Sequence, residues 1–83
     1  MAIDGPTITA KLLEALSGAE ISVVDTTGGG DHYAARIVHA GFEGRSLVDR
    51  HRMVYAALGP AMKADIHALA LETLTPAEAR TRR

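Results

Sequence analysis

Residues 20–38 read EISVVDTTGGGDHYAARIV, and this stretch decides the fold. Apolar side chains alternate with polar or small ones over residues 20–25 and again over residues 33–38, which is the period of a half-buried strand. The residues between the two runs, 26–31, include three consecutive glycines. A connection this short joins antiparallel neighbours, because a parallel pair needs a crossover of about a dozen residues or more. The stretch therefore predicts a β-hairpin.

A helix is predicted before the hairpin, over residues 7–17. Thr7 suits the N-cap position, and Gly18 suits the left-handed conformation that ends a helix. The apolar residues on one face of this helix are Ile8, Leu12, Leu13 and Leu16.

A second helix is predicted after the hairpin, where Ser46 and Asp49 form a capping box. The residues that share one face of it are Leu47, His51, Val54, Tyr55 and Leu58. Gly59 and Pro60 interrupt this helix, and Pro60 suits the first position of a further short helix over residues 60–64.

A third strand and a last helix complete the chain. Residues 67–72 alternate between larger side chains and alanine or glutamate, which predicts a strand. Thr75, Pro76 and Glu78 read as the cap, first position and capping-box partner of a terminal helix. The predicted order is αββααβα.

This order predicts an α+β domain with a three-stranded mixed sheet. Two helices between the second and third strands are long enough for a parallel crossover. Aliphatic side chains occupy alternate positions of each strand and therefore one face of the sheet, which predicts that the helices cover that face. We expect residues 1–83 to form a single domain in which residues 1–5 and 80–83 are frayed.

Composition excludes several classes of protein. The net charge of −1 and the pI of about 6.4 do not provide the basic field of a general nucleic-acid binder. No apolar run approaches the roughly 20 residues of a membrane span, and the N-terminus does not read as a signal peptide. We expect a cytoplasmic protein that does not bind membranes.

The chain has four histidines and no cysteine. Without thiolates, the imidazoles are the candidate ligands for a metal bound by this chain, and two imidazoles cannot complete a site without a partner. His51 lies on the apolar face of the second helix, so we interpret it as partly buried or as a partner contact. His39 reads as an ordinary surface residue.

Five segments carry a family resemblance. They are DTTGGGDHY (25–33), FEG (42–44), RHRMVY (50–55), IHALAL (66–71) and TP (75–76). In this order they resemble the BolA family over nearly the whole chain. The resemblance implies a class II KH-like fold with the core order αββααβ, which agrees with the order predicted above. It also implies two activities, which are partnership with a monothiol glutaredoxin and regulation of transcription by binding DNA.

The first activity uses a [2Fe-2S] cluster shared between the two proteins. The resemblance places the family's C-terminal histidine ligand on His67, while the glutaredoxin provides its active-site cysteine and a bound glutathione thiolate. The family's second ligand comes from the loop between the first two strands, where this chain offers His32. Alternatively His32 is structural, and Asp31 or an exogenous ligand fills that position. The isolated chain is expected to be a monomer without a cofactor.

For the second activity, the chain offers a basic surface but lacks the loop with which KH domains bind nucleic acid. KH domains clamp a nucleic-acid backbone with a GxxG loop between two helices, whereas here the only GxxG string, residues 41–44, precedes a helix and contains a glutamate. Arg45, Arg50, His51 and Arg52 could contact DNA or a partner, or the arginines could form a solvated face. These residues predict weak, salt-sensitive binding at most.

Catalysis is not expected. It needs a nucleophile and a base within hydrogen-bond reach in a pocket, and a three-stranded domain of this size has little volume for one. Asp31 and His32 are consecutive, so their side chains point to opposite sides of a strand.

Overall fold

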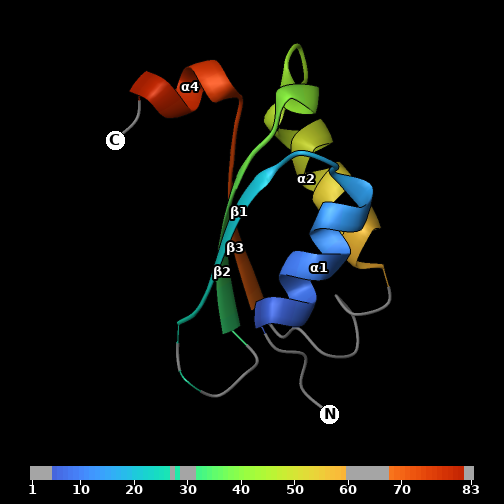
Figure 1. Ribbon diagram of the computed structural model, residues 1–83, viewed down its shortest axis with the longest axis vertical. Coiled ribbons are helices and arrows are strands. Elements are labelled where there is room, and N and C mark those ends of the chain that lie inside the picture. The colour runs from blue at the N-terminus through green and yellow to red at the C-terminus, as the bar shows by residue number, and fades with distance from the viewer. Residues whose placement is uncertain (1–4, 27, 29–31, 60–67, 82–83) are drawn as a thin grey trace.

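The computed structural model describes residues 5–26, 28, 32–59 and 68–81 (Figure 1). Its elements are α1 (Gly5–Ala15), β1 (Glu20–Asp25), β2 (His32–Val38), the 3-10 turn η1 (Ala40–Phe42), α2 (Leu47–Leu58), β3 (Ala68–Leu74) and α4 (Pro76–Thr81). The short helix predicted over residues 60–64 lies outside the described residues. In the ranges given above, no helix is long and apolar enough to cross a bilayer.

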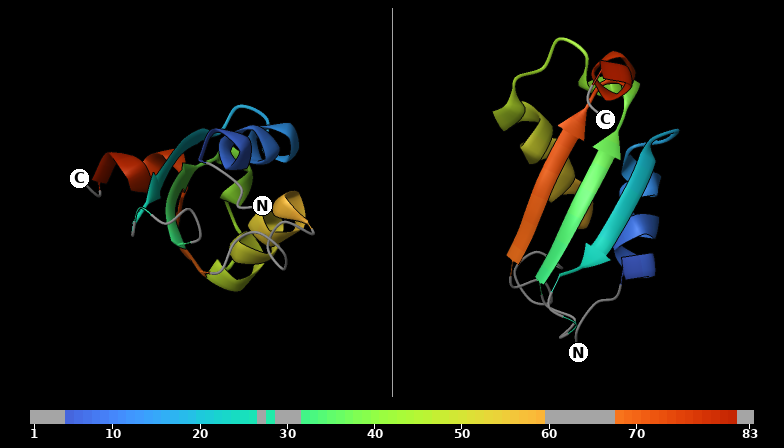
Figure 2. Two further views of the ribbon diagram at one scale, coloured as in Figure 1. Left: turned by 90° about the horizontal axis from the view of Figure 1, so that it is seen from below. Right: turned by 90° about the vertical axis from the view of Figure 1, so that its left-hand side faces the viewer.

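The three strands form one mixed sheet in the order β1-β2-β3. β1 and β2 are antiparallel, with Asp25 opposite Tyr33 at the hairpin end. β2 and β3 are parallel, with His32 opposite Ala68 at the same end. Figure 2 shows the strands side by side with α1 and α2 behind them. The predicted hairpin, the mixed sheet and the α+β class are confirmed.

The main core lies between α1, α2 and one face of the sheet. Its buried side chains include Ile8, Leu12, Leu16, Tyr33, Ala35, Ile37, Phe42, Val54 and Leu58. Tyr33, Ala35 and Ile37 are alternate residues of β2, so the period-two pattern selects the face that is buried. Full burial of one such aliphatic side chain contributes about 1.5–3 kcal/mol.

α4 lies on the other side of the sheet from α1 and α2 (Figures 1 and 2). Val38 and Leu74 lie opposite each other in the register and are buried, although their parity places them on the face away from the main core. Pro76 and Ala79 of α4 line the same hollow as Val38. The prediction that helices cover one face is thus correct for α1 and α2, whereas α4 covers one end of the opposite face.

The outer ends of the two terminal helices differ from the prediction. α1 begins at Gly5 rather than at Thr7, because Pro6 suits the first turn, where its missing N–H is not needed. α4 includes Arg80 and Thr81. These residues and Gly5 are therefore helical, where we expected frayed ends.

Candidate functional site

The end of the sheet where β2 begins carries the predicted ligand His32. The carbonyl oxygen of this half-buried residue accepts hydrogen bonds from the backbone N–H of Thr26 at 2.9 Å and from the Thr26 hydroxyl at 3.2 Å. On its other side His32 lies opposite Ala68, the first residue of β3. Because Tyr33 faces the main core, the side chain of His32 belongs to the opposite face. The hydrogen bonds from Thr26 and the pairing with β3 therefore hold the backbone of this residue in place.

The loop before His32 is described only in part. The N–H of Gly28 donates to Asp25 Oδ1 at 2.9 Å, and Gly28 has a φ of 77°. This left-handed conformation favours glycine over any residue with a Cβ. Asp31, the alternative ligand, lies outside the described residues.

His67, the other predicted ligand, also lies outside the described residues. Ala68 is the next residue along the chain, and it lies opposite His32. In the ranges that are described, no group of three or more histidine, aspartate or glutamate side chains could hold a metal ion. The assignment of His32 and His67 as ligands therefore stays a prediction.

Arg50 is buried, which corrects the prediction that it belongs to an exposed binding surface. Its side chain is 9% exposed, and its Nη1 donates to Glu78 Oε1 at 2.8 Å and to the carbonyl of Thr73 at 3.2 Å. Its Nε donates to the carbonyl of Arg45 at 3.1 Å, and its guanidinium lies 5.8 Å from the centre of the Phe42 ring. Arg50 therefore joins α2 to β3 and α4 from within the protein.

Glu78 has a second role at the start of α4. Its carboxylate accepts from the backbone N–H of Thr75 at 2.9 Å, and the Thr75 hydroxyl accepts from the backbone N–H of Glu78 at 3.1 Å. This reciprocal pair is the predicted capping box. The same oxygen, Oε1, accepts from Thr75 and from Arg50, so one carboxylate both starts α4 and fastens it to α2.

α2 buries only part of the face that was predicted. The predicted N-cap is confirmed, since Ser46 Oγ accepts from the Asp49 N–H at 3.2 Å. However, Leu47 and Tyr55 are 63% and 42% exposed. The side chains that α2 buries in the protein or packs against the core are Arg50, Met53, Val54, Ala57 and Leu58. The predicted face is therefore correct for Val54 and Leu58 and wrong for Leu47 and Tyr55, because the buried face of α2 includes Arg50 in place of these two apolar residues.

The other predicted contact residues remain at the surface. Arg45 is exposed, and its Nε donates to the carbonyl of Gly41 at 3.2 Å. Arg52 is 77% exposed and lies 4.0 Å from the carboxylate of Asp49. His51 is half-buried, with its ring edge-to-face against Tyr55 at a centroid distance of 6.4 Å. Arg45 and Arg52 are thus the two arginines of the predicted set that solvent can reach.

The GxxG string at residues 41–44 folds as a tight turn. Phe42 within it is fully buried, and Gly44 has a φ of 74°. The string anchors the chain to the core before α2 begins, which is a different place from the exposed loop between two helices that a KH domain uses.

The sequence matches the family model described as BolA-like protein over residues 12–78. Human BolA-like protein 1 is 38% identical over 78 residues, which cover 86% of this chain and 57% of the human protein. The chain therefore spans little more than half the length of that relative.

Solved structures share the whole fold. A bol-like protein from Babesia bovis has a TM-score of 0.84 and 34% identity, over 99% of this chain and 98% of that chain. The BolA domain of SufE1 from Arabidopsis thaliana has a TM-score of 0.80 and 37% identity, over 93% of this chain and 99% of that chain. The same fold thus makes up nearly all of one solved chain and one domain of a longer protein.

Proposed function

This chain belongs to the BolA-like family, and from that membership we propose that it is a non-enzymatic adaptor that binds a monothiol glutaredoxin and shares a [2Fe-2S] cluster with it. The cluster is the adaptor's cargo, held through histidine ligands from this chain. The role belongs to iron–sulfur cluster trafficking or to iron and redox regulation.

The observation that carries the proposal is the register between β2 and β3. His32 lies opposite Ala68, and Ala68 directly follows His67 in the sequence. Consecutive Cα atoms are about 3.8 Å apart and paired strands are about 4.8 Å apart. These spacings keep the Cα atoms of the two histidines at the same end of the sheet, and this proximity supports the proposal.

The two predicted histidine ligands of this chain would supply two of the four ligands that a [2Fe-2S] cluster needs. Two histidines ligate one iron in Rieske-type centres, where they replace two cysteines. This chain has no cysteine, so the thiolates must come from the partner's cysteine and from glutathione. If His32 is structural, Asp31 or an exogenous ligand takes the second position.

We expect the purified chain alone to be colourless, monomeric and free of iron, because its imidazoles cannot complete a cluster. Absorption spectroscopy, iron analysis and gel filtration measure these three properties. A stable [2Fe-2S] centre assembled on the chain alone, under anaerobic reconstitution, would contradict the adaptor proposal.

The proposal itself is tested by mixing the chain with a monothiol glutaredoxin that carries a glutathione-ligated cluster. The visible spectrum should change from that of an all-thiolate centre to that of a mixed imidazole and thiolate centre. An unchanged spectrum at saturating concentrations of this chain would show that the chain does not ligate the cluster.

Regulation of transcription through DNA binding is the second candidate, and the exposed Arg45 and Arg52 are the observations that favour it. Because Arg50 is buried, we expect about two phosphate contacts, which correspond to a log-log salt slope of about −2 on duplex DNA. Fluorescence anisotropy at several salt concentrations measures this slope. Nanomolar, sequence-specific binding at physiological salt would instead favour the regulator.

A further inference from the structure

The face of the sheet that points away from α1 and α2 is largely uncovered by helices. We call it the open face, and its accessible residues are Ser22, Val24, Ala34, Arg36, Ala70 and Glu72. A shallow hollow of about 260 Å³ lies among these residues. A second hollow of about 520 Å³ lies between the end of this face and α4. Arg36 lines both hollows.

The second hollow combines an apolar lining with positive charge. Its apolar residues are Val38, Ala40, Pro76 and Ala79, and its charged residues are Glu20, Arg36 and Arg80. Two arginines and one glutamate line the hollow, and Glu72 beside it offsets part of the positive charge by pairing with Arg36 through Nε. The volume is within the usual range of ligand sites. This composition fits a ligand that carries a carboxylate next to an apolar group.

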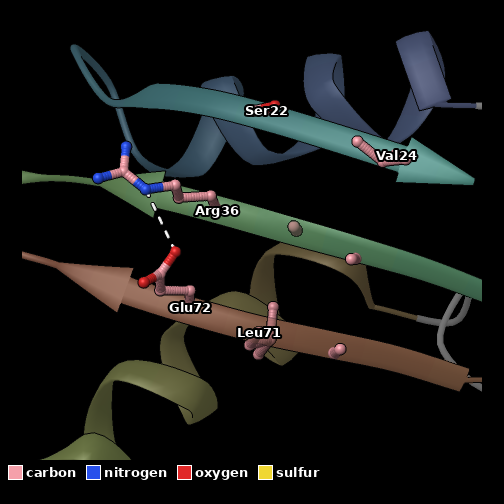
Figure 3. Close-up of a pocket in the computed structure, with 8 residues that line it drawn as sticks. Ser22, Val24, Arg36, Leu71 and Glu72 are labelled. Atoms are coloured by element: carbon pink, nitrogen blue, oxygen red, sulfur yellow. Dashed lines mark ion pairs between the residues drawn. The ribbon is translucent and has the colours of Figure 1, made fainter. Parts of the chain in front are cut away.

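Arg36 is oriented for such a ligand by Glu72. The Nε of Arg36 lies 3.2 Å from Glu72 Oε1, while the side chain of Arg36 is 43% exposed. The ion pair is made through Nε, and Figure 3 shows the two terminal nitrogens of Arg36 directed away from Glu72. Figure 3 shows the guanidinium extending along the sheet toward the carboxyl ends of β2 and β3, where α4 follows. The ion pair thus fixes one edge of the guanidinium and leaves its donor fork for a carboxylate.

The opposite wall of the hollow is held in place by the Arg50 network. α4 is fastened by the contact between Arg50 and Glu78 and by the capping pair of Thr75 and Glu78. These contacts set the position of Pro76, Ala79 and Arg80 relative to the sheet. The hollow is therefore formed before any ligand binds, which reduces the entropy lost on binding.

We propose that the second hollow binds an acidic segment of a partner polypeptide. The carboxylate of a glutamate or aspartate side chain contacts Arg36 and Arg80, and a neighbouring apolar side chain packs on Val38 and Pro76. This site lies at the carboxyl end of β2, about 20 Å along the strand from His32 at a rise of about 3.3 Å per residue. It does not rest on the cluster proposal, and its position lets the chain hold two partners at once.

The probe is the peptide acetyl-Ala-Leu-Glu-Ala-amide, titrated into the 15N-labelled protein and followed by two-dimensional NMR. We expect shift changes centred on Arg36, Val38 and Ala79. Arg36→Gln should weaken binding about tenfold, which is the loss of a charge-assisted hydrogen-bonded pair, and Arg80→Gln should weaken it less. Arg52→Gln is the matched control, because Arg52 is an exposed arginine on α2, and it should leave binding unchanged.

Two further ligands test which chemical groups of the peptide are needed for binding. The same peptide with glutamine in place of glutamate should bind at least about tenfold more weakly, because it lacks the charge. Free glutarate should bind more weakly than the peptide, because it lacks the leucine side chain. The proposal is wrong if no shifts appear up to about 10 mM peptide, if glutamine replaces glutamate without loss, or if Arg52→Gln weakens binding as much as Arg36→Gln. Tighter binding of glutarate than of the peptide would overturn the assignment to a polypeptide.

Discussion

His67→Ala is expected to abolish the mixed-ligand cluster spectrum of the complex with a monothiol glutaredoxin, whereas His32→Ala should only reduce it. The family resemblance assigns the C-terminal ligand to His67, so this substitution removes a direct ligand of the cluster. At the position of His32, by contrast, Asp31 or an exogenous ligand can fill the vacancy. Visible absorption and circular dichroism at matched iron content measure the difference.

The matched control for both variants is His39→Ala. His39 follows the opposite end of β2, where it packs against Phe42, so its removal should leave the cluster spectrum unchanged.

A ligating imidazole must also be neutral, and the ordinary pKa of histidine is about 6.5. As pH falls below that value, protonation competes with the metal and the complex should weaken. Equal spectra for the wild type and His67→Ala would remove His67 from the site.

Arg50→Ala is expected to lower the free energy of unfolding by about 3 kcal/mol, because it removes the guanidinium that pairs with Glu78 and donates to the Thr73 carbonyl. We choose the lower end of the range for a broken buried pair because the Glu78 side chain is 35% exposed. In a domain of this size the loss corresponds to a decrease in Tm of about 12–24 °C. Urea and thermal unfolding followed by circular dichroism measure both quantities.

Arg52→Ala is the control for this prediction. Arg52 is exposed and its nearest carboxylate is 4.0 Å away, so its removal should change stability by less than about 0.5 kcal/mol. If Arg50→Ala costs no more than Arg52→Ala, the network around Arg50 does not stabilise the fold. At a temperature where the variant stays folded, Arg50→Ala should also leave the salt slope of DNA binding unchanged, since a buried guanidinium contacts no phosphate.

The hairpin, the strands and the caps could be predicted from the sequence because each depends on residues close together in the chain. The alternation over residues 20–25 and 33–38 is visible within one strand length, and the structure pairs these runs as predicted. Ser46 caps α2 through Asp49, and Thr75 caps α4 through Glu78, at a separation of three residues in both cases. The left-handed Gly18 after α1 is an equally local signal.

The candidate site could be predicted only in part. The resemblance selected His32 and His67, and the structure places His32 opposite the residue that follows His67. Parallel pairing of β2 with β3 was predicted from the length of the crossover, but the register was not. Register depends on how the side chains of both strands pack against the core, and a shift by one residue would exchange the two faces.

The sequence by itself determined the class of the fold, the order of its elements and where most of its helices and strands begin and end. Only the tertiary structure decided which face of α2 is buried and which arginine is free to bind. Arg50 reads as a surface residue until Thr73 and Glu78, 23 and 28 residues away along the chain, supply its acceptors. Arg36 is likewise oriented by Glu72 on a neighbouring strand. A charged side chain can be buried or held in one orientation only where a hydrogen-bonding or oppositely charged group contacts it. For Arg50 and Arg36 that group comes from a distant part of the chain, which folding brings into contact.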